Sequence, residues 1–452
     1  SRCLFIKIIV KFRRWDIKSS YFMNENTKNS TNISKVTYFS SLKYPDFLRM
    51  WLASLFAGSS HWGLIVIRGW VVYQISDSSM YVGLVTFAAL IPMVVINPFI
   101  GYLADKFQRR RILQIMFFVN FIHNLGLAIL YFMDLIVPWH LVVLAFVQGT
   151  ARASQMPSGQ ALIPNIVPKE NLLNAVALNM STVHATRLLG PLAIAPFLSY
   201  IGSNEDSING TDIAFFICTG FYALSFIFAL MIRNTSSGKI SSESFFEGFA
   251  EGIRYVHSNK PILIIIMLTT LHCMLTMSFE SVLPYFSVNK LGAEGAAVSF
   301  LMMCVGVGAL NASIFLAGTS SEKLKGRLFY YFAILSGLAP VLLSLSTNLL
   351  LSMFATMLMG LGQAGFMIIS TTIIQIMSPD YIRGRIAGIY AMYAGGSMAL
   401  FNFLNGFVAD FIDPGYSLAI QGIFFTLLVI IYRKQEVLKN VYSGKSYALN
   451  QG

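Results

Sequence analysis

Four ionisable residues lie inside long apolar stretches of the chain: Arg68, Arg152, Arg187 and Glu280. A charged side chain is costly in an apolar surrounding, so it is expected where it binds a ligand, moves a proton or pairs with another charge. Three arginines and one carboxyl group favour an anionic or carboxylate-bearing ligand. Arg187 has an alternative, structural role, in which it donates to backbone carbonyls beside Gly190.

Glu280 is the carboxyl group placed well inside an apolar stretch, and it is our candidate for proton coupling. Burial favours its neutral form and a nearby guanidinium favours its charged form, so its protonation could change with conformation. Arg68 and Glu280 are displaced to the same side of their stretches, and we expect them to approach each other in an external gate. The alternative is a static buried pair that only fixes packing.

Composition identifies the surroundings of these residues as a membrane. Of 452 residues, 56% are hydrophobic and 12% are charged, and the mean hydropathy is +0.65. Soluble proteins carry about 25% charged residues, and a spanning helix needs ~20 apolar residues. Twelve apolar stretches are long enough, and spanning segments of this kind must be helices. The predicted helices cover residues 48–74, 81–104, 111–134, 139–163, 172–201, 212–232, 261–288, 293–317, 327–345, 348–377, 385–410 and 416–433.

Lysine and arginine alternate between connecting segments. One set of segments is rich in them, whereas the opposite set holds only Lys290, and its segment 203–212 is acidic. The positive-inside rule then places both termini in the cytoplasm. The net charge of +12 is explained by these segments, and no basic groove for nucleic acid is present. We expect a multi-pass protein of the inner membrane.

The helices divide into two sets of six. We expect a cytoplasmic tail at 1–46, six-helix bundles at 47–232 and 261–433, a linker at 233–260 and a second tail at 434–452. The linker should hold an amphipathic surface helix near Phe245–His257. Met23 opens a polar stretch and is our expected start, so residues 1–22 are either upstream of the native protein or a basic segment on the membrane surface.

Two short patterns indicate an internal repeat. Gly101-Tyr-Leu-Ala-Asp105-Lys106 and Gly318-Thr-Ser-Ser-Glu322-Lys323 both read as glycine, three residues, an acid and lysine. One proline precedes the fifth helix and another precedes the eleventh. The number of residues between these two prolines nearly equals the number between the two glycine patterns. Six helices return the chain to the same side, so the repeats are parallel, as in the major facilitator superfamily.

The segment GYLADKFQRRR at 101–111 resembles the loop signature of that superfamily, with Gln108 in place of a glycine. WVVYQISDSSMYVGLV at 70–85, ALIPNIVPKENLLNAVAL at 161–178, TRLLGP at 186–191 and PDYIRGRIAGIY at 379–390 resemble its secretion-effector branch, which includes enterobactin exporters and macrolide efflux proteins. The expected fold is therefore all-α, with twelve transmembrane helices in two pseudo-symmetric halves.

The resemblance implies a central cavity lined by helices one, four, seven and ten, which are the helices that carry polar residues at helical spacing. The expected lining residues are His61, Arg68, Gln148, Arg152, Gln155, His272, Thr276 and Gln363.

The resemblance also implies a cytoplasmic gate, in which Asp105 accepts hydrogen bonds from the positive end of the eleventh helix. The alternative is that this charge cluster only sets orientation. The fifth helix keeps Gly190 and Pro191 of an antiporter signature, but Ile194 and Ala195 replace its paired glycines. The expected gating residues are Gly101, Asp105, Arg109, Arg110, Gly190, Pro191, Glu322, Arg383 and Arg385.

Several chemistries are disfavoured. The four cysteines and six histidines show no disulfide or metal spacing. Gly360–Gly365 has the glycine spacing of a dinucleotide-binding loop, but it lies within an apolar helix without a preceding strand, so a dinucleotide site is disfavoured. The sequence also lacks the pattern of a phosphate-binding loop. We therefore expect no cofactor and no enzymatic activity.

The expected function is secondary active export of a small amphiphilic molecule, with an anionic group favoured, such as a siderophore or a drug. The partners would be membrane lipids and the proton gradient, and the chain would act as a monomer. The alternatives are uptake or lipid movement by the same fold and, with less support, a non-transporting membrane sensor.

Overall fold

A computed structural model describes residues 39–96, 108–198, 209–233, 245–293, 295–317, 319, 321–379 and 382–443. Every regular element in these ranges is a helix, which confirms the all-α prediction. The elements, with η for a 3-10 helix, are η1 (Ser40–Lys43), α2 (Pro45–Ser76), α3 (Ser79–Val95), α5 (Arg109–Phe132), α6 (Pro138–Ile166), α7 (Lys169–Leu198), α8 (Gly210–Leu230), α9 (Phe245–Ser258), α10 (Lys260–Leu275), η2 (Glu280–Val282), α11 (Leu283–Leu291), α12 (Gly295–Ala317), α13 (Glu322–Ser344), α14 (Leu349–Met377), α15 (Arg383–Ala409), α16 (Pro414–Tyr432) and α17 (Glu436–Ser443).

Local sequence explains where several helices begin. Pro45, Pro138 and Pro414 are the first residues of α2, α6 and α16. Proline is favoured there because the first N–H groups of a helix have no partner within the helix. Asp413 caps α16 by accepting a hydrogen bond from the backbone N–H of Gly415 at 2.7 Å.

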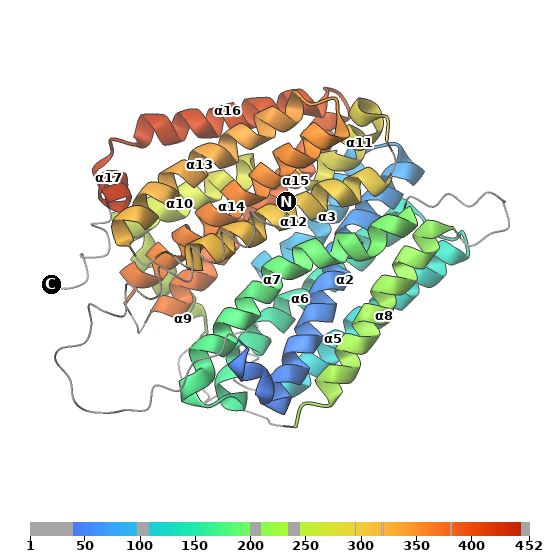
Figure 1. The fold of residues 1–452 in the computed structure, drawn as a ribbon, viewed down its shortest axis with the longest axis horizontal. Coiled ribbons are helices and arrows are strands. Elements are labelled where there is room, and N and C mark those ends of the chain that lie inside the picture. The colour runs from blue at the N-terminus through green and yellow to red at the C-terminus, as the bar shows by residue number, and fades with distance from the viewer. Residues whose placement is uncertain are drawn as a thin grey trace, which may run out of the picture. The chain divides into compact units, whose positions relative to one another are not determined.

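The helices pack in two sets, which we call the first bundle (α2, α3, α5, α6, α7 and α8) and the second bundle (α10 to α16). Figure 1 shows the first in blue and green and the second in yellow to red. The most extensive contacts between the bundles come from two pairs of helices: α3 packs along α15, and α7 packs along α12. Each pair combines the second span of one bundle with the second-last span of the other, where α10 to α11 count as the first span of the second bundle. The two contacts therefore correspond under the expected repeat.

Glycines bring both joining pairs close together. A Cβ atom at Gly83 of α3 would lie 2.7 Å from the carbonyl oxygen of Asn402 on α15. A Cβ atom at Gly306 of α12 would lie 2.7 Å from the backbone nitrogen of Leu188 on α7. Small residues at such crossings let helix backbones approach, and van der Waals packing then holds the helices together.

The predicted continuous helix at 261–288 is wrong. It is broken into α10, η2 and α11, and α10 ends at Leu275. Pro284 supplies the reason, since its ring would clash with the carbonyl of Glu280 in a continuous helix and it has no N–H to donate. Glu280 therefore lies on the broken segment and not on the regular polar face that includes Thr269 and His272.

Eight of the spans in the described residues are long and apolar enough to cross a membrane: Pro45–Ser76, Arg109–Phe132, Gly210–Leu230, Lys260–Leu291, Gly295–Ala317, Lys323–Ser344, Leu349–Met377 and Pro414–Tyr432. α3 is a shorter apolar helix of 17 residues, and the predicted second span continues beyond it to 104, outside the described residues. α6, α7 and α15 have 29, 30 and 27 residues, and their polar side chains lower their hydropathy.

Candidate functional site

The first bundle meets the second where α2 ends and α3 begins, a region we call the Asp77 end. Asp410, which follows α15, accepts hydrogen bonds from the hydroxyl of Ser78 at 2.5 Å, the N–H of Ser79 at 2.6 Å and the N–H of Met80 at 3.2 Å. Nearby, the side-chain amide of Asn289 on α11 donates to the Tyr73 hydroxyl at 3.0 Å. Hydrogen bonds thus join the bundles at this end.

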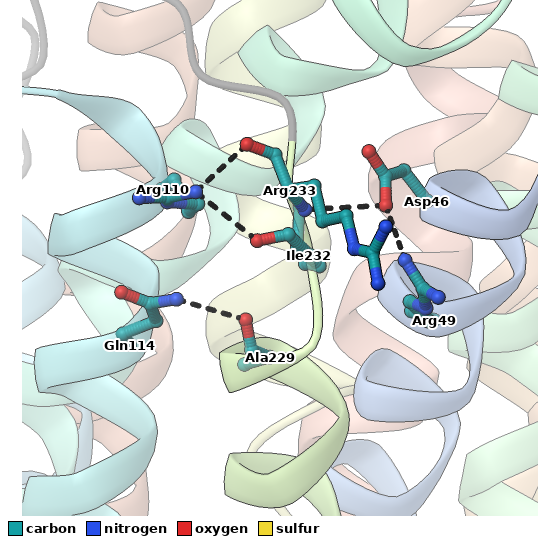
Figure 2. Close-up of polar contacts among 7 residues, drawn as sticks. All are labelled: Asp46, Arg49, Arg110, Gln114, Ala229, Ile232 and Arg233. Atoms are coloured by element: carbon teal, nitrogen blue, oxygen red, sulfur yellow. Dashed lines mark hydrogen bonds and ion pairs between the residues drawn. The ribbon is translucent and has the colours of Figure 1, made fainter.

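The opposite end of the first bundle, which we call the Arg110 end, has a different set of contacts (Figure 2). Arg110 donates to the carbonyls of Ile232 at 3.3 Å and Arg233 at 2.7 Å, just after α8. Asp46 on α2 pairs with Arg49 at 2.8 Å and accepts from the Arg233 N–H at 3.2 Å. Gln114 donates to the Ala229 carbonyl, one of the last of α8, at 3.0 Å. The last carbonyls of a helix have no intrahelical partner, so Gln114 and Arg110 stabilise the end of α8 and the turn that follows it.

The other predicted gating residues are spread over several elements. Gly101 and Asp105 lie outside the described residues, and the side chain of Glu322 is not described. Arg383 donates to the carbonyls of Gln375 and Ser378 at the end of α14, at 3.0 and 3.1 Å. Arg109 begins α5.

Arg385, another predicted gating residue, forms an ion pair with Glu251 of the linker helix α9. A Cβ atom at Gly252 of α9 would lie 2.8 Å from the Ile389 side chain of α15. α9 therefore packs on the second bundle. In the first bundle, Gly190 of α7 lies against the backbone of Ser59 on α2, and Pro191 follows it within α7.

A cavity lies within the first bundle, between α2, α5, α6 and α7 and toward the Arg110 end. Its lining combines one guanidinium group with amides, hydroxyls and apolar side chains. The lining residues are Met50, Ser54, Gly58, Leu113, Phe117, Arg152, Gln155, Gly159, Gln160, Asn179, Thr182, Val183 and Thr186.

The structure thus places two of the predicted cavity residues, Arg152 and Gln155, in the lining of this cavity. Sequence reasoning missed the contribution of α7. Asn179, Thr182 and Thr186 stand three and four residues apart, so the same search for polar residues on one helical face would have found them.

The predicted lining residues of the second bundle are buried in a hydrogen-bond network in this conformation. His272 shares a hydrogen bond of 2.7 Å with Ser336, and Ser336 donates to the Thr276 hydroxyl at 3.0 Å. Gln363 donates to the Thr276 carbonyl at 2.7 Å. This carbonyl is freed by the break after α10, so Gln363 stabilises the break.

Glu280 is buried in η2, between the two bundles. The charged group that acts on it within the described residues is the guanidinium of Arg187, from α7 of the first bundle. That guanidinium also lies over the ring of Trp62, 4.7 Å from its centroid. The predicted approach of Arg68 to Glu280 is therefore not found: Arg187 occupies that position, and Arg68 faces Tyr222 and Cys218 within the first bundle.

Residues 36–447 match the model of a family described as transmembrane secretion effectors. The chain belongs to this family of the major facilitator superfamily. It is 22% identical over 405 residues to the staphyloferrin A transporter of Staphylococcus aureus, which covers 87% of this chain and 94% of that protein. It is 19% identical over 361 residues to macrolide efflux protein A of Streptococcus pyogenes, which covers 79% of this chain and 87% of that protein.

Solved structures share this fold at low sequence identity. A POT family transporter in complex with 5-aminolevulinic acid superposes with a TM-score of 0.69 and 12% identity, covering 88% of this chain and 96% of that one. A bacterial homologue of the lysosomal transporter Spinster, in an inward-facing and unoccupied conformation, gives a TM-score of 0.62 and 12% identity, covering 90% and 98%. The transmembrane secretion effector described here is thus a multi-pass transporter of the bacterial inner membrane, and its relatives are transporters and not enzymes.

Proposed function

We propose that this protein is a proton-coupled exporter that moves a small amphiphilic molecule with an anionic group by alternating access. Twelve helices would span the membrane in two halves, near 47–232 and 261–433, with both termini in the cytoplasm. The observation that carries the proposal is the position of Arg152, in a cavity toward the Arg110 end, while hydrogen bonds join the bundles at the Asp77 end. In the positive-inside orientation this is an inward-facing state.

The chemistry of the cavity supports an anionic, amphiphilic substrate. The Arg152 guanidinium offers a fork of N–H donors that matches a carboxylate. Gln155, Gln160 and Asn179 add amide groups, and Met50 and Phe117 add apolar surface. The relatives are named as a staphyloferrin A transporter and a macrolide efflux protein, which supports a small molecule as the substrate.

Glu280 is the proposed site of proton coupling. It lies at the broken helix of the second bundle, within electrostatic range of Arg187 of the first, so a change in its charge would alter the attraction between the bundles. Protonation would weaken that attraction and favour separation, which is a route from proton binding to alternating access. Asp105, with Gly101 and the arginines that follow, remains the proposed gate at the cytoplasmic side.

Transport in inverted membrane vesicles tests the function. Labelled siderophore, macrolide and fatty acid are each supplied outside vesicles with and without the protein, and a proton gradient is imposed or abolished with a protonophore. Export predicts accumulation of one class only with both the protein and the gradient. Accumulation in whole cells would indicate uptake, exchange of a labelled phospholipid between leaflets would indicate lipid movement, and gradient-independent transport would contradict proton coupling.

A further inference from the structure

Arg68 of α2 is a buried guanidinium without a counter-charge among the described residues. Only 2% of its surface is exposed, and neither its Nε nor its Nη1 group has an acceptor among the described residues. The groups near enough to interact with its charge are His61, His123, Cys218 and Tyr222, and none of them is a carboxylate. Buried charges in proteins are normally paired, because isolation from water is costly.

Further donors from another helix stand close by. The side-chain amide of Gln148 on α6 is buried, and neither its nitrogen nor its oxygen has a hydrogen-bond partner in the described part of the chain. Nδ1 of His61 is also buried without a partner there. Tyr222 links these groups, since it lies beside Gln148 and is also within range of the Arg68 charge. The core of the first bundle thus brings unpartnered polar groups around a positive charge, and no carboxylate among the described residues balances that charge.

We propose that Arg68, with Gln148 and His61, binds a small inorganic anion of the chloride class in the core of the first bundle. A monovalent anion supplies the counter-charge and accepts several N–H bonds without a preferred direction. The site suits a small ion because its groups are buried: Gln148 and Tyr222 are each 1% exposed. A water molecule would supply an acceptor but no charge, so it satisfies only half of the requirement.

Polar groups connect this site to the cavity. Arg152 lines the cavity, and its charge acts on both His61 and Tyr222. The side chain of Gln155, also in the lining, accepts a hydrogen bond of 3.4 Å from Asn120 in the bundle core. An anion that enters the cavity therefore meets positive charge along the way to Arg68. The anion site is distinct from the proposed substrate site, and its test needs no transport measurement.

Thermal unfolding of the purified full-length protein in detergent tests the proposal, at constant ionic strength in sodium chloride, bromide, citrate or gluconate. We expect chloride and bromide to raise the melting temperature in a saturable way, and citrate and gluconate to leave it unchanged. Arg68→Gln should abolish the halide effect. In gluconate this variant should melt no lower than the wild type, because it removes an uncompensated charge.

Arg49→Gln is the matched control, since Arg49 lies on the same helix and already pairs with Asp46, and it should keep the halide effect. Gln148→Leu should weaken the halide response without removing it. If Arg68→Gln does not fold, anomalous scattering from bromide-soaked crystals of the wild type tests the proposal instead. A bromide beside Arg68 would support it, and the absence of bromide there would contradict it. Equal melting temperatures in chloride and gluconate, stabilisation by citrate alone, or a halide effect that survives Arg68→Gln would overturn the proposal.

Discussion

The carboxylate of Asp410, just after α15, accepts a hydrogen bond of 2.6 Å from the backbone N–H of Ser79, the first residue of α3. The N–H groups in the first turn of a helix lack intrahelical partners and carry positive partial charge, so an acid there is stabilising. The family resemblance implies the reciprocal contact, from Asp105 after the second helix to the start of the eleventh. Because α3 and α15 pack antiparallel, the contact at Asp410 is its counterpart at the opposite end.

Asp410→Ala should therefore shift the protein toward a state that is open at the Asp77 end. The variant loses three hydrogen bonds to a charged acceptor. One hydrogen bond to a charged acceptor contributes about 1.5–3 kcal/mol. The loss of a single such bond would therefore shift the equilibrium between the closed and open states by roughly 10-fold or more. Spin labels on the exposed residues Trp139 and Tyr416, in a variant without the native cysteines, report the separation of the bundles at this end. We expect a longer-distance population to appear.

Asp413→Ala is the control for charge. Asp413 lies at the same end, but its partner Lys290 belongs to the same bundle, at 3.4 Å. This variant should keep the distance distribution of the parent protein. If both variants gave the same distribution, Asp410 would have no special part in holding the bundles together.

The sequence was sufficient for the fold class because hydropathy and charge alternation report directly on the bilayer. It did not reveal the break in the predicted helix at 261–288. The mean hydropathy of the segment is high enough for one continuous span, and the break depends on Pro284 together with side chains from other helices. Asn405 donates to the Ser278 carbonyl at 2.5 Å, and Asn402 accepts from the Ser281 N–H at 3.3 Å. Such long-range compensation cannot be inferred from a single segment.

The site was predictable only in part. The polar faces of the helices identified Arg152 and Gln155, which line the cavity. Periodicity gives the polar face of a helix but not the helix that this face contacts. The prediction that Arg68 approaches Glu280 was therefore wrong, and the charge that acts on Glu280 is that of Arg187. Pairing across the bundles is a property of tertiary structure.

Gly83→Val should disrupt the contact between α3 and α15. A Cβ atom there would lie 2.7 Å from the Asn402 carbonyl oxygen, so the helices would have to separate. We expect a lower melting temperature and loss of transport, since overpacking typically costs about 1–3 kcal/mol. Gly220→Val on α8 is the control, because a Cβ atom there meets nothing within 4 Å. A variant at Gly83 as stable as the one at Gly220 would contradict the close packing.

Gln363→Leu should destabilise the broken helix. It removes the donor to the Thr276 carbonyl and leaves that carbonyl buried without this partner, at a cost of about 1–3 kcal/mol. The measurement is thermal unfolding of the detergent-purified protein, compared with Gln375→Leu at an exposed position of the same helix α14. The two variants should differ in melting temperature, with Gln363→Leu the lower. Equal melting temperatures would mean that the hydrogen bond from Gln363 to the Thr276 carbonyl does not stabilise the protein.

Arg152→Gln should weaken the binding of an anionic substrate while leaving the fold intact, because Arg152 lines a cavity. Loss of a hydrogen bond to a charged group costs about 1.5–3 kcal/mol, which corresponds to roughly a 10- to 100-fold weaker apparent affinity. Substrate titration in vesicles measures the change. Arg152→Lys keeps the charge and should recover part of the affinity, whereas a neutral substrate should be transported equally by both variants. Unchanged affinity for the anionic substrate in Arg152→Gln would place its site elsewhere.

Glu280→Gln should make transport in vesicles insensitive to pH, if the carboxyl group couples the proton to the movement of the bundles. The same variant removes the negative charge that acts on the buried Arg187 guanidinium, so it should also lower the melting temperature. A double-mutant cycle with Arg187→Gln separates the two effects, because the double variant should regain stability but not pH dependence. Glu247→Gln, at an exposed acid on α9, is the control and should retain the pH profile. A wild-type pH profile in Glu280→Gln would rule out coupling through this residue, and additive stabilities would rule out the pair.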